Sequence, residues 1–156
     1  MNRFSATTES EADVAAESSA IWAALTDPVL LPKLTPLLRH IEVDGDLWRW
    51  EMSRIHLLGV HISPTFTERM RFDPIQRIDY THEPPAGRTE HTGADGWYDL
   101  SDAPGGTHLS ISLTMHVELP LARAAGPAVT RIMRGMMQRT GDRFSANLLR
   151  HLGVTR

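Results

Sequence analysis

Cysteine is absent from the 156 residues, which excludes disulfide bonds, thiol catalysis, iron–sulfur clusters and cysteine-ligated zinc. Long apolar runs are absent too: the most apolar segment, residues 29–34, is interrupted by proline and falls far short of the ~18 residues of a membrane span. The first residues run into Glu9, Glu11 and Asp13 without the apolar core of a secretory signal. We therefore expect a soluble, cytoplasmic protein.

Catalytic and metal-binding motifs are missing as well. The sequence contains no Gly-x-Ser-x-Gly elbow, no dinucleotide-binding or phosphate-binding glycine loop and no His-Glu-x-x-His pair, and residues 93–96 are typical of a loop or bulge. His56 and His61 flank a predicted turn, and His108 and His116 would stand about 26 Å apart on one strand. We expect isolated, mostly exposed histidines, no metal, no cofactor and no assigned catalytic residue.

The length of the chain indicates one globular domain over residues 1–156. A chain of this size buries roughly 70% of the surface that its unfolded form exposes, enough for a sizeable core.

Net charge is −3, yet residues 121–156 hold seven arginines against Asp142 alone, so the other 120 residues carry −9. This asymmetry favours a basic helix lying on an acidic sheet; an anionic partner is the alternative. We expect no nucleic-acid partner.

The N-terminal part predicts a strand over residues 4–14 followed by two short helices. Ser18 or Ser19 is a candidate N-cap for the first helix, and Pro28 ends it. Leucines recur at helical spacing through residues 28–38. Two short helices directly after a first strand are a distinctive order of elements.

The middle of the chain predicts strands separated by glycine- and proline-containing turns. Asp44-Gly45-Asp46 is typical of a hairpin turn, and Asp102-Ala103-Pro104-Gly105-Gly106 is a second clear turn. The predicted strands cover residues 41–44, 47–54, 60–72, 78–82 and 88–100.

The C-terminal third shows the clearest periodicity. Apolar residues alternate with polar ones from 108 to 119, which indicates a strand with one buried face. Apolar residues then recur every three or four positions from Pro127 to Leu152, and Gly153 is a stop signal. We predict an α+β fold in which about seven antiparallel strands bury one face against this long helix.

The element order and three segments resemble START-related, SRPBCC-type proteins, the polyketide cyclase/dehydrase-like superfamily. The segments are residues 18–28, residues 105–109, and residues 117–121 leading into the long helix. The resemblance spans nearly the whole chain. It implies a helix-grip fold, in which a curved antiparallel sheet wraps the C-terminal helix around an apolar cavity, and a single START-like ligand-binding domain. Fold alone implies no reaction.

Candidate cavity walls come from the inward faces of these elements. Glu68 shares the parity of Phe66 and Met70, so strict alternation buries its carboxyl; a bulge at Pro64 would instead turn it to solvent. Thr140 interrupts the apolar stripe of the long helix near its middle. The predicted ligand-binding residues are Trp48, Trp50, Phe66, Glu68, Met70, Tyr80, Met115, Met133, Met136 and Thr140.

Other residues of this region carry weaker expectations. The two same-face indoles of Trp48 and Trp50 need partners for their N–H groups, which indicates a partly polar cavity. Methionines are typical of an adaptable apolar pocket, although they also occur in ordinary cores. Asn147 and His151, near the helix end, are expected to face solvent.

Three functional hypotheses remain open at the level of sequence. The first is a carrier or sensor of a small hydrophobic molecule such as a lipid, quinone or polyketide. The second is an aromatase/cyclase-like enzyme in which Glu68 or His82 moves protons. The third uses Arg139, Arg143 and Arg150 to dock on an anionic membrane or a protein. Either a monomer or a homodimer is compatible with the sequence.

Overall fold

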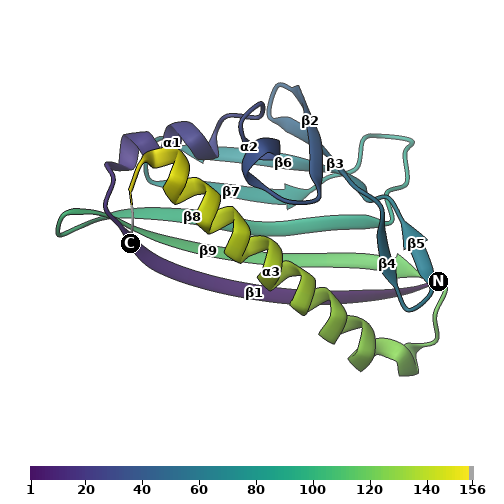
Figure 1. Cartoon of the computed structure of the whole chain (residues 1–156). Helices are drawn as coiled ribbons and strands as arrows, with labels where there is room; N and C mark the ends of the chain where they lie inside the picture. Colours follow the sequence, from purple (N-terminus) through teal and green to yellow (C-terminus); the bar gives the residue numbers. More distant parts are fainter. Residues whose placement is uncertain (155–156) are drawn as a thin grey trace.

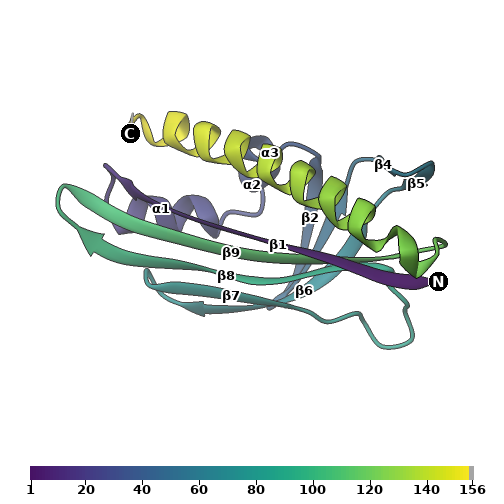
Figure 2. The same cartoon turned by 90° about the horizontal axis from the view of Figure 1, so that it is seen from below.

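The computed structural model describes residues 1–154, in which a curved seven-stranded antiparallel sheet lies against one long helix (Figures 1 and 2). The strand order is β1-β9-β8-β7-β6-β3-β2. The predicted α+β, helix-grip fold is confirmed. The strands of this sheet are β1 (Asn2–Val14), β2 (Leu38–Asp44), β3 (Leu47–Met52), β6 (Thr65–Asp73), β7 (Arg77–His82), β8 (Thr92–Ala103) and β9 (Gly106–Leu119).

The long strands β1, β8 and β9 form one side of the sheet and follow the sequence pattern closely. β9 pairs with β8 from Gly106 to Val117 and with β1 along the whole length of β1. Strict alternation along β9 places Leu109, Val117 and Leu119 among the buried residues. The turn predicted at residues 102–106 joins β8 to β9.

A separate two-stranded hairpin interrupts the strands predicted over residues 47–54 and 60–72. It consists of β4 (Ile55–Leu57) and β5 (Val60–Ile62). Its turn uses left-handed backbone at Leu58 and Gly59. Pro64 cannot donate to a ladder, and its carbonyl instead accepts from Met52 N–H at 2.8 Å. The chain leaves the main sheet here, so the predicted strand boundaries were wrong.

The two short helices are α1 (Ser18–Leu25) and α2 (Leu31–Leu34). Neither predicted serine caps α1: Glu17 occupies the N-cap position, and Ser18 Oγ bonds Thr107 Oγ1 at 2.9 Å. α2 is a single turn, shorter than the predicted helix over 28–38. Its C-cap Thr35 is already extended, and Leu37 has a left-handed φ of 71°.

The long helix α3 (Gly126–Leu152) follows the short 3-10 helix η1 (Arg123–Ala125) and ends at Gly153, whose φ is 71°. It lies along the inner side of the sheet (Figure 2). Asn147 Nδ2 donates to Leu34 O at 2.9 Å, which attaches α3 to α2. The expectation that Asn147 faces solvent was therefore wrong. Within residues 1–154, no helix is long and apolar enough to cross a membrane.

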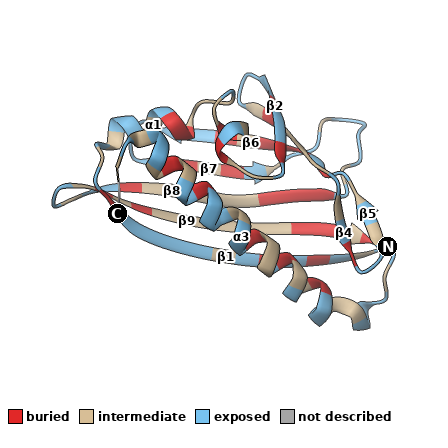
Figure 3. Cartoon of the chain, in the orientation of Figure 1, coloured by how far each residue is buried: buried red, intermediate tan, exposed pale blue. Residues whose placement is uncertain are grey.

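Two apolar clusters hold the helix and sheet together. Figure 3 marks the buried residues along α3 and the strands. One joins α1, α2 and the C-terminal half of α3, including Phe144 and Leu148, to the inner side of the sheet. The other joins the N-terminal half of α3, including Met133 and Met137, to β1, β9 and the β4–β5 hairpin, where Leu57 is buried. Because the core is divided, the middle of α3 spans the sheet between two packed ends.

Candidate functional site

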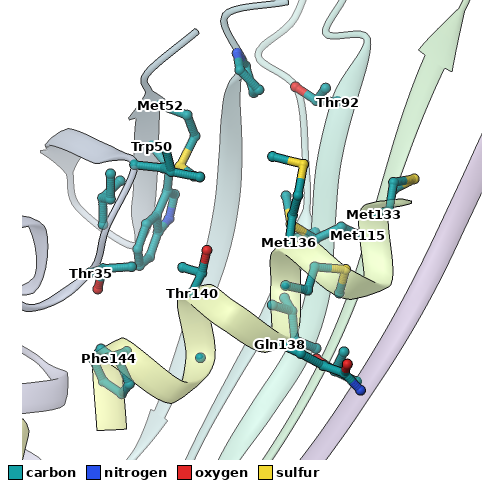
Figure 4. Close-up of a pocket in the computed structure, with 18 of the residues that line it drawn as sticks. Thr35, Trp50, Met52, Thr92, Met115, Met133, Met136, Gln138, Thr140 and Phe144 are labelled. Carbon is teal, nitrogen blue, oxygen red and sulfur yellow. The ribbon is translucent and has the colours of Figure 1, made fainter. Parts of the chain in front are cut away.

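A cavity of about 540 Å³ lies between the middle of α3 and the inner side of the sheet (Figure 4). Its walls combine members of both apolar clusters. The helix contributes three methionines and Phe144, and the β4–β5 hairpin closes part of one end with Ile55, Leu57 and Ile62. A volume of this size is typical of small-molecule pockets.

Eight of the ten predicted site residues lie on the cavity wall. They are Trp50, Phe66, Glu68, Tyr80, Met115, Met133, Met136 and Thr140. The other two, Trp48 and Met70, are buried in the core but do not line the cavity. Trp48 packs beside Trp50 and Phe72, with ring centroids 6.1 and 5.8 Å away. The prediction that Trp48 and Met70 form the wall was therefore wrong.

Glu68 is fully buried on β6, and the β3–β6 pairing runs without a register shift, so no bulge at Pro64 turns this side chain outward. Its Oε1 accepts a hydrogen bond from Ala94 N–H at 3.0 Å, and its Oε2 has no partner. Burial raises the pKa of Glu68 to about 9, the Ala94 N–H opposes this shift, and the carboxylates of Asp95 and Glu90 add to it. The carboxyl is therefore protonated at neutral pH.

Trp50 is the second wall residue with an unsatisfied polar group. Its Nε1 is buried and has no hydrogen-bond partner within residues 1–154. Trp50 stands opposite Phe66 in the β3–β6 register, and Trp48 stands opposite Glu68. Trp50 and Glu68 are thus diagonal neighbours on one face, a spacing that long side chains can bridge.

Two tyrosines lie on the wall: Tyr80 is buried and hydrogen-bonded, and Tyr98 is half-buried. Tyr80 Oη donates to Ser112 O at 3.2 Å, and the ring of Tyr98 lies 5.9 Å from that of Tyr80. Burial raises the pKa of Tyr98 to about 12 and holds the pKa of Tyr80 well above its usual value. Both phenols are therefore neutral over the physiological range.

A group of polar residues, the histidine cluster (Thr67, His82, Glu90, Asp95 and His116), lies beside Glu68 where β7 and β8 stop pairing. The last β7–β8 pair is Tyr80 with Gly96. Beyond it, side chains replace ladder bonds: Glu68 accepts from Ala94 N–H, and Asp95 Oδ1 accepts from His82 N–H at 3.0 Å.

The two histidines of this cluster form a hydrogen-bonded chain. His116 Nε2 lies 3.1 Å from His82 Nδ1, and His82 Nε2 lies 2.9 Å from Glu90 Oε1. Glu90 in turn accepts from both the backbone and the hydroxyl of Thr67 at 2.8 Å. Burial, together with Arg3 and His82, lowers the pKa of His116. These contacts fit two neutral imidazoles, with His116 donating to His82 and His82 donating to Glu90.

This arrangement corrects two expectations from the sequence. His82 and His116 are neither isolated nor mostly exposed, and residues 93–96 are part of β8. Gly93 is required there because a Cβ would clash with both imidazole rings. Glycine inside a strand signals close approach of another group, so this pattern could have indicated the cluster. Only His116 lines the cavity; His82 lies behind the wall.

Metal binding finds no support in the arrangement of these side chains. No group of three or more histidine, aspartate or glutamate side chains in the described part of the chain is placed to hold a metal ion.

The residues that sequence reasoning missed on the wall are mainly Leu31, Leu38, Ile55, Leu57 and Tyr98. Their apolar character gave no functional signal, since it is also what an ordinary core requires.

The basic residues of α3 lie away from the cavity. Arg139, Arg143 and Arg150 are exposed, and they form no ion pair with any residue between 1 and 154. The sequence favoured a basic helix lying on an acidic sheet; α3 does lie along the sheet, but within residues 1–154 these three arginines are not paired with its acidic side chains. Their docking role stays a prediction.

Solved structures with the same fold cover nearly the entire chain. A START superfamily protein from Mycobacterium smegmatis matches with a TM-score of 0.67 and 15% identity, over 94% of this chain and 97% of that one. The Zhui aromatase/cyclase from Streptomyces sp. R1128 matches with a TM-score of 0.65 and 15% identity, over 96% and 94%. The di-domain aromatase/cyclase StfQ from the steffimycin biosynthetic pathway matches with a TM-score of 0.63 and 14% identity, over 93% and 49%. At these identities the likeness establishes the fold alone.

Sequence comparison gives the family directly. No curated protein matches the chain significantly. The family model for polyketide cyclase/dehydrase and lipid transport proteins, in contrast, matches residues 5–149. That match extends from the start of β1 almost to the end of α3 and so includes every wall of the cavity. The chain belongs to the polyketide cyclase/dehydrase and lipid transport family.

Proposed function

We propose that the protein binds and carries a small hydrophobic molecule in the cavity between α3 and the sheet. The observation that supports this most directly is the cavity itself, about 540 Å³ with walls dominated by apolar side chains. A ligand that buries roughly 300 Å² of apolar surface there would gain about 7 kcal/mol. A gain of this size alone corresponds to a dissociation constant of roughly 10 μM, and because part of it offsets the lost motion of the ligand, apolar burial by itself should give weaker affinity than this.

The methionines suit a carrier that accepts related molecules. Met52, Met115, Met133, Met136 and Met137 all line the cavity (Figure 4 labels four of them). Unbranched thioether side chains change shape at low cost, so the wall can adapt to ligands of different outline. We therefore expect selection by size and polarity more than by detailed shape.

Dye binding tests this proposal. Nile red, an uncharged apolar dye, should become fluorescent with the purified protein, and added lipids, quinones or polyketides should displace it. Native mass spectrometry should then show a 1:1 complex with a displacing compound. Absence of dye binding and of any complex would contradict the proposal.

An aromatase/cyclase-like enzyme is the second candidate, favoured by one observation. Glu68 places a buried, protonated carboxyl in the wall of the cavity, where it is able to deliver a proton to a bound polyketone. Incubation with a linear poly-β-ketone and mass analysis of the products tests this. Glu68→Gln should abolish turnover while ligand affinity stays close to that of the wild type; unchanged turnover would exclude Glu68 as the acid.

A further inference from the structure

Two polar groups of the cavity wall have no partner, and both belong to residues that face the same side of the sheet. Trp50 Nε1 and Glu68 Oε2 are closed off from solvent without a hydrogen bond. A buried polar group left unpaired costs roughly 1–3 kcal/mol. Proteins rarely leave such groups unpaired, and a bound ligand that pairs them is one physical explanation.

Both groups act as hydrogen-bond donors toward a ligand. An indole Nε1 can only donate. The Glu68 carboxyl is held in its protonated form by burial, and Oε1 is already engaged as the acceptor for Ala94 N–H. Its remaining hydrogen-bonding capacity is therefore best used by an O–H that donates from Oε2. An acceptor atom on the ligand would suit both groups.

The register places Trp50 and Glu68 close enough for one bound ligand to contact both residues. Trp50 and Glu68 are diagonal neighbours across β3 and β6, and side chains so placed approach each other over roughly 7–8 Å between backbones. Because both atoms are closed off from solvent, binding requires each side chain to turn its donor toward the ligand. Figure 4 shows Trp50 on β3 and Thr140 on α3 among the residues that line the cavity.

The charge of the wall excludes amphiphilic molecules whose polar end is an anion. The lining residues include no lysine and no arginine, but they do include Glu68 and, at the exposed edge, Glu9 and Asp142. A carboxylate or phosphate brought into this cavity would lose its water without gaining a counter-charge, which is strongly unfavourable. A fatty-acid anion or a phospholipid headgroup therefore does not fit inside.

We propose that the cavity selects an uncharged apolar molecule with a hydrogen-bond-accepting oxygen, such as a ketone, quinone or ester carbonyl, held by Trp50 Nε1 and the Glu68 carboxyl. This inference rests on the proposed function and specifies its ligand class.

Four probes with the same twelve-carbon chain test the inference by displacement of Nile red at pH 7: dodecan-2-one, dodecane, dodecanoate and dodecylamine. The ketone should bind about 10-fold more tightly than the alkane, which corresponds to one or two net hydrogen bonds. Dodecanoate and dodecylamine should bind more weakly than the ketone. Equal affinity for ketone and alkane, or tighter binding of either ion, would overturn the inference while leaving the carrier function in place. Failure of Nile red to bind at all would instead contradict the carrier function.

A pair of tryptophan variants locates the donor. Trp50→Phe removes the Nε1 donor and keeps an aromatic ring, so the preference for the ketone over the alkane should fall by about 3-fold or more. Trp22→Phe is the matched control, because Trp22 packs on α1 outside the cavity, 6.2 Å from the Phe72 ring. An unchanged preference in Trp50→Phe, or an equal loss in both variants, would overturn the role of Trp50.

Two measurements at Glu68 complete the test. Glu68→Gln keeps a donor, so the ketone should bind at pH 7 as it does to the wild type. Raising the pH from 7 to 10 should weaken ketone binding to the wild type, because the carboxyl loses its proton, and should not weaken binding to Glu68→Gln. The same pH dependence in both proteins would contradict donation by Glu68.

Discussion

The chemistry of this cavity depends on individual residues, above all on Glu68. Alternation along β6 predicts its inward direction, but the sequence alone leaves open a bulge at Pro64 that would have reversed it. The structure shows no such bulge, since the chain breaks before β6 into a separate hairpin. The expectation of polar partners for the inward indoles is not met at Trp50, whose Nε1 has no hydrogen-bond partner in residues 1–154.

The proton on Glu68 links folding to pH. The pKa of this carboxyl is about 9 in the folded protein and near 4.5 in an unfolded chain, so the folded state holds a proton that the unfolded state releases between these values. The contribution of Glu68 to stability is therefore complete below pH 4.5 and is lost as pH rises toward 9.

Glu68→Gln should remove this part of the pH dependence. Between pH 5 and pH 8 the wild type should lose roughly 4 kcal/mol of stability relative to the variant, because Gln needs no proton to stay neutral. Urea unfolding at pH 5 and pH 8 measures the difference. If the free energies of unfolding of the wild type and of Glu68→Gln changed with pH in the same way, Glu68 would not be the group responsible.

Gly93 tests the packing of the histidine cluster. An added Cβ would meet the rings of both His82 and His116, so Gly93→Ala should lower the free energy of unfolding by about 2 kcal/mol or more. Gly141→Ala on α3 is the control: a Cβ there has open space, and alanine should stabilise the helix by up to about 1 kcal/mol. Equal effects of the two variants would contradict the described contact between the rings and β8.

At the scale of elements, periodic segments could be predicted and contacts between distant segments could not. β9 and α3 each repeat a pattern over a dozen residues or more, and their existence and type follow from the sequence. The pairing of His82 with His116 joins positions 34 residues apart and depends on the bare backbone of Gly93 between them. The contact of Asn147 could not be predicted either, since its partner is a backbone carbonyl of α2, far away in the sequence.

The Asn147 contact predicts how α3 is fixed beside α2. Asn147→Ala removes its hydrogen bond to Leu34 O and should lower the free energy of unfolding by about 1 kcal/mol. Arg143→Ala is a suitable control, because Arg143 is exposed on the same helix with no partner in residues 1–154. Thermal unfolding of both variants measures this. Equal small changes would mean that the Asn147 contact does not hold the helix.

At the scale of the whole molecule, the defining feature is a core divided into two clusters by a hollow. The resemblance to the START-related superfamily predicted this hollow, and the structure contains it. Volume and wall composition could not be read from sequence, since Trp48 and Met70 have the same parity as true wall residues yet pack into the core. Burial depends on sheet curvature and on the placement of α3, which alternation does not specify.

The most direct test of a ligand inside this hollow is to fill it. Thr140→Trp places an indole in the cavity from the middle of α3, whereas Arg143→Trp places one on the exposed side of the same helix. The dissociation constant of dodecan-2-one, measured by displacement of Nile red, should rise at least 10-fold for Thr140→Trp and stay near the wild-type value for Arg143→Trp. Unchanged affinity in a folded Thr140→Trp variant would show that the ligand binds elsewhere and would contradict the account.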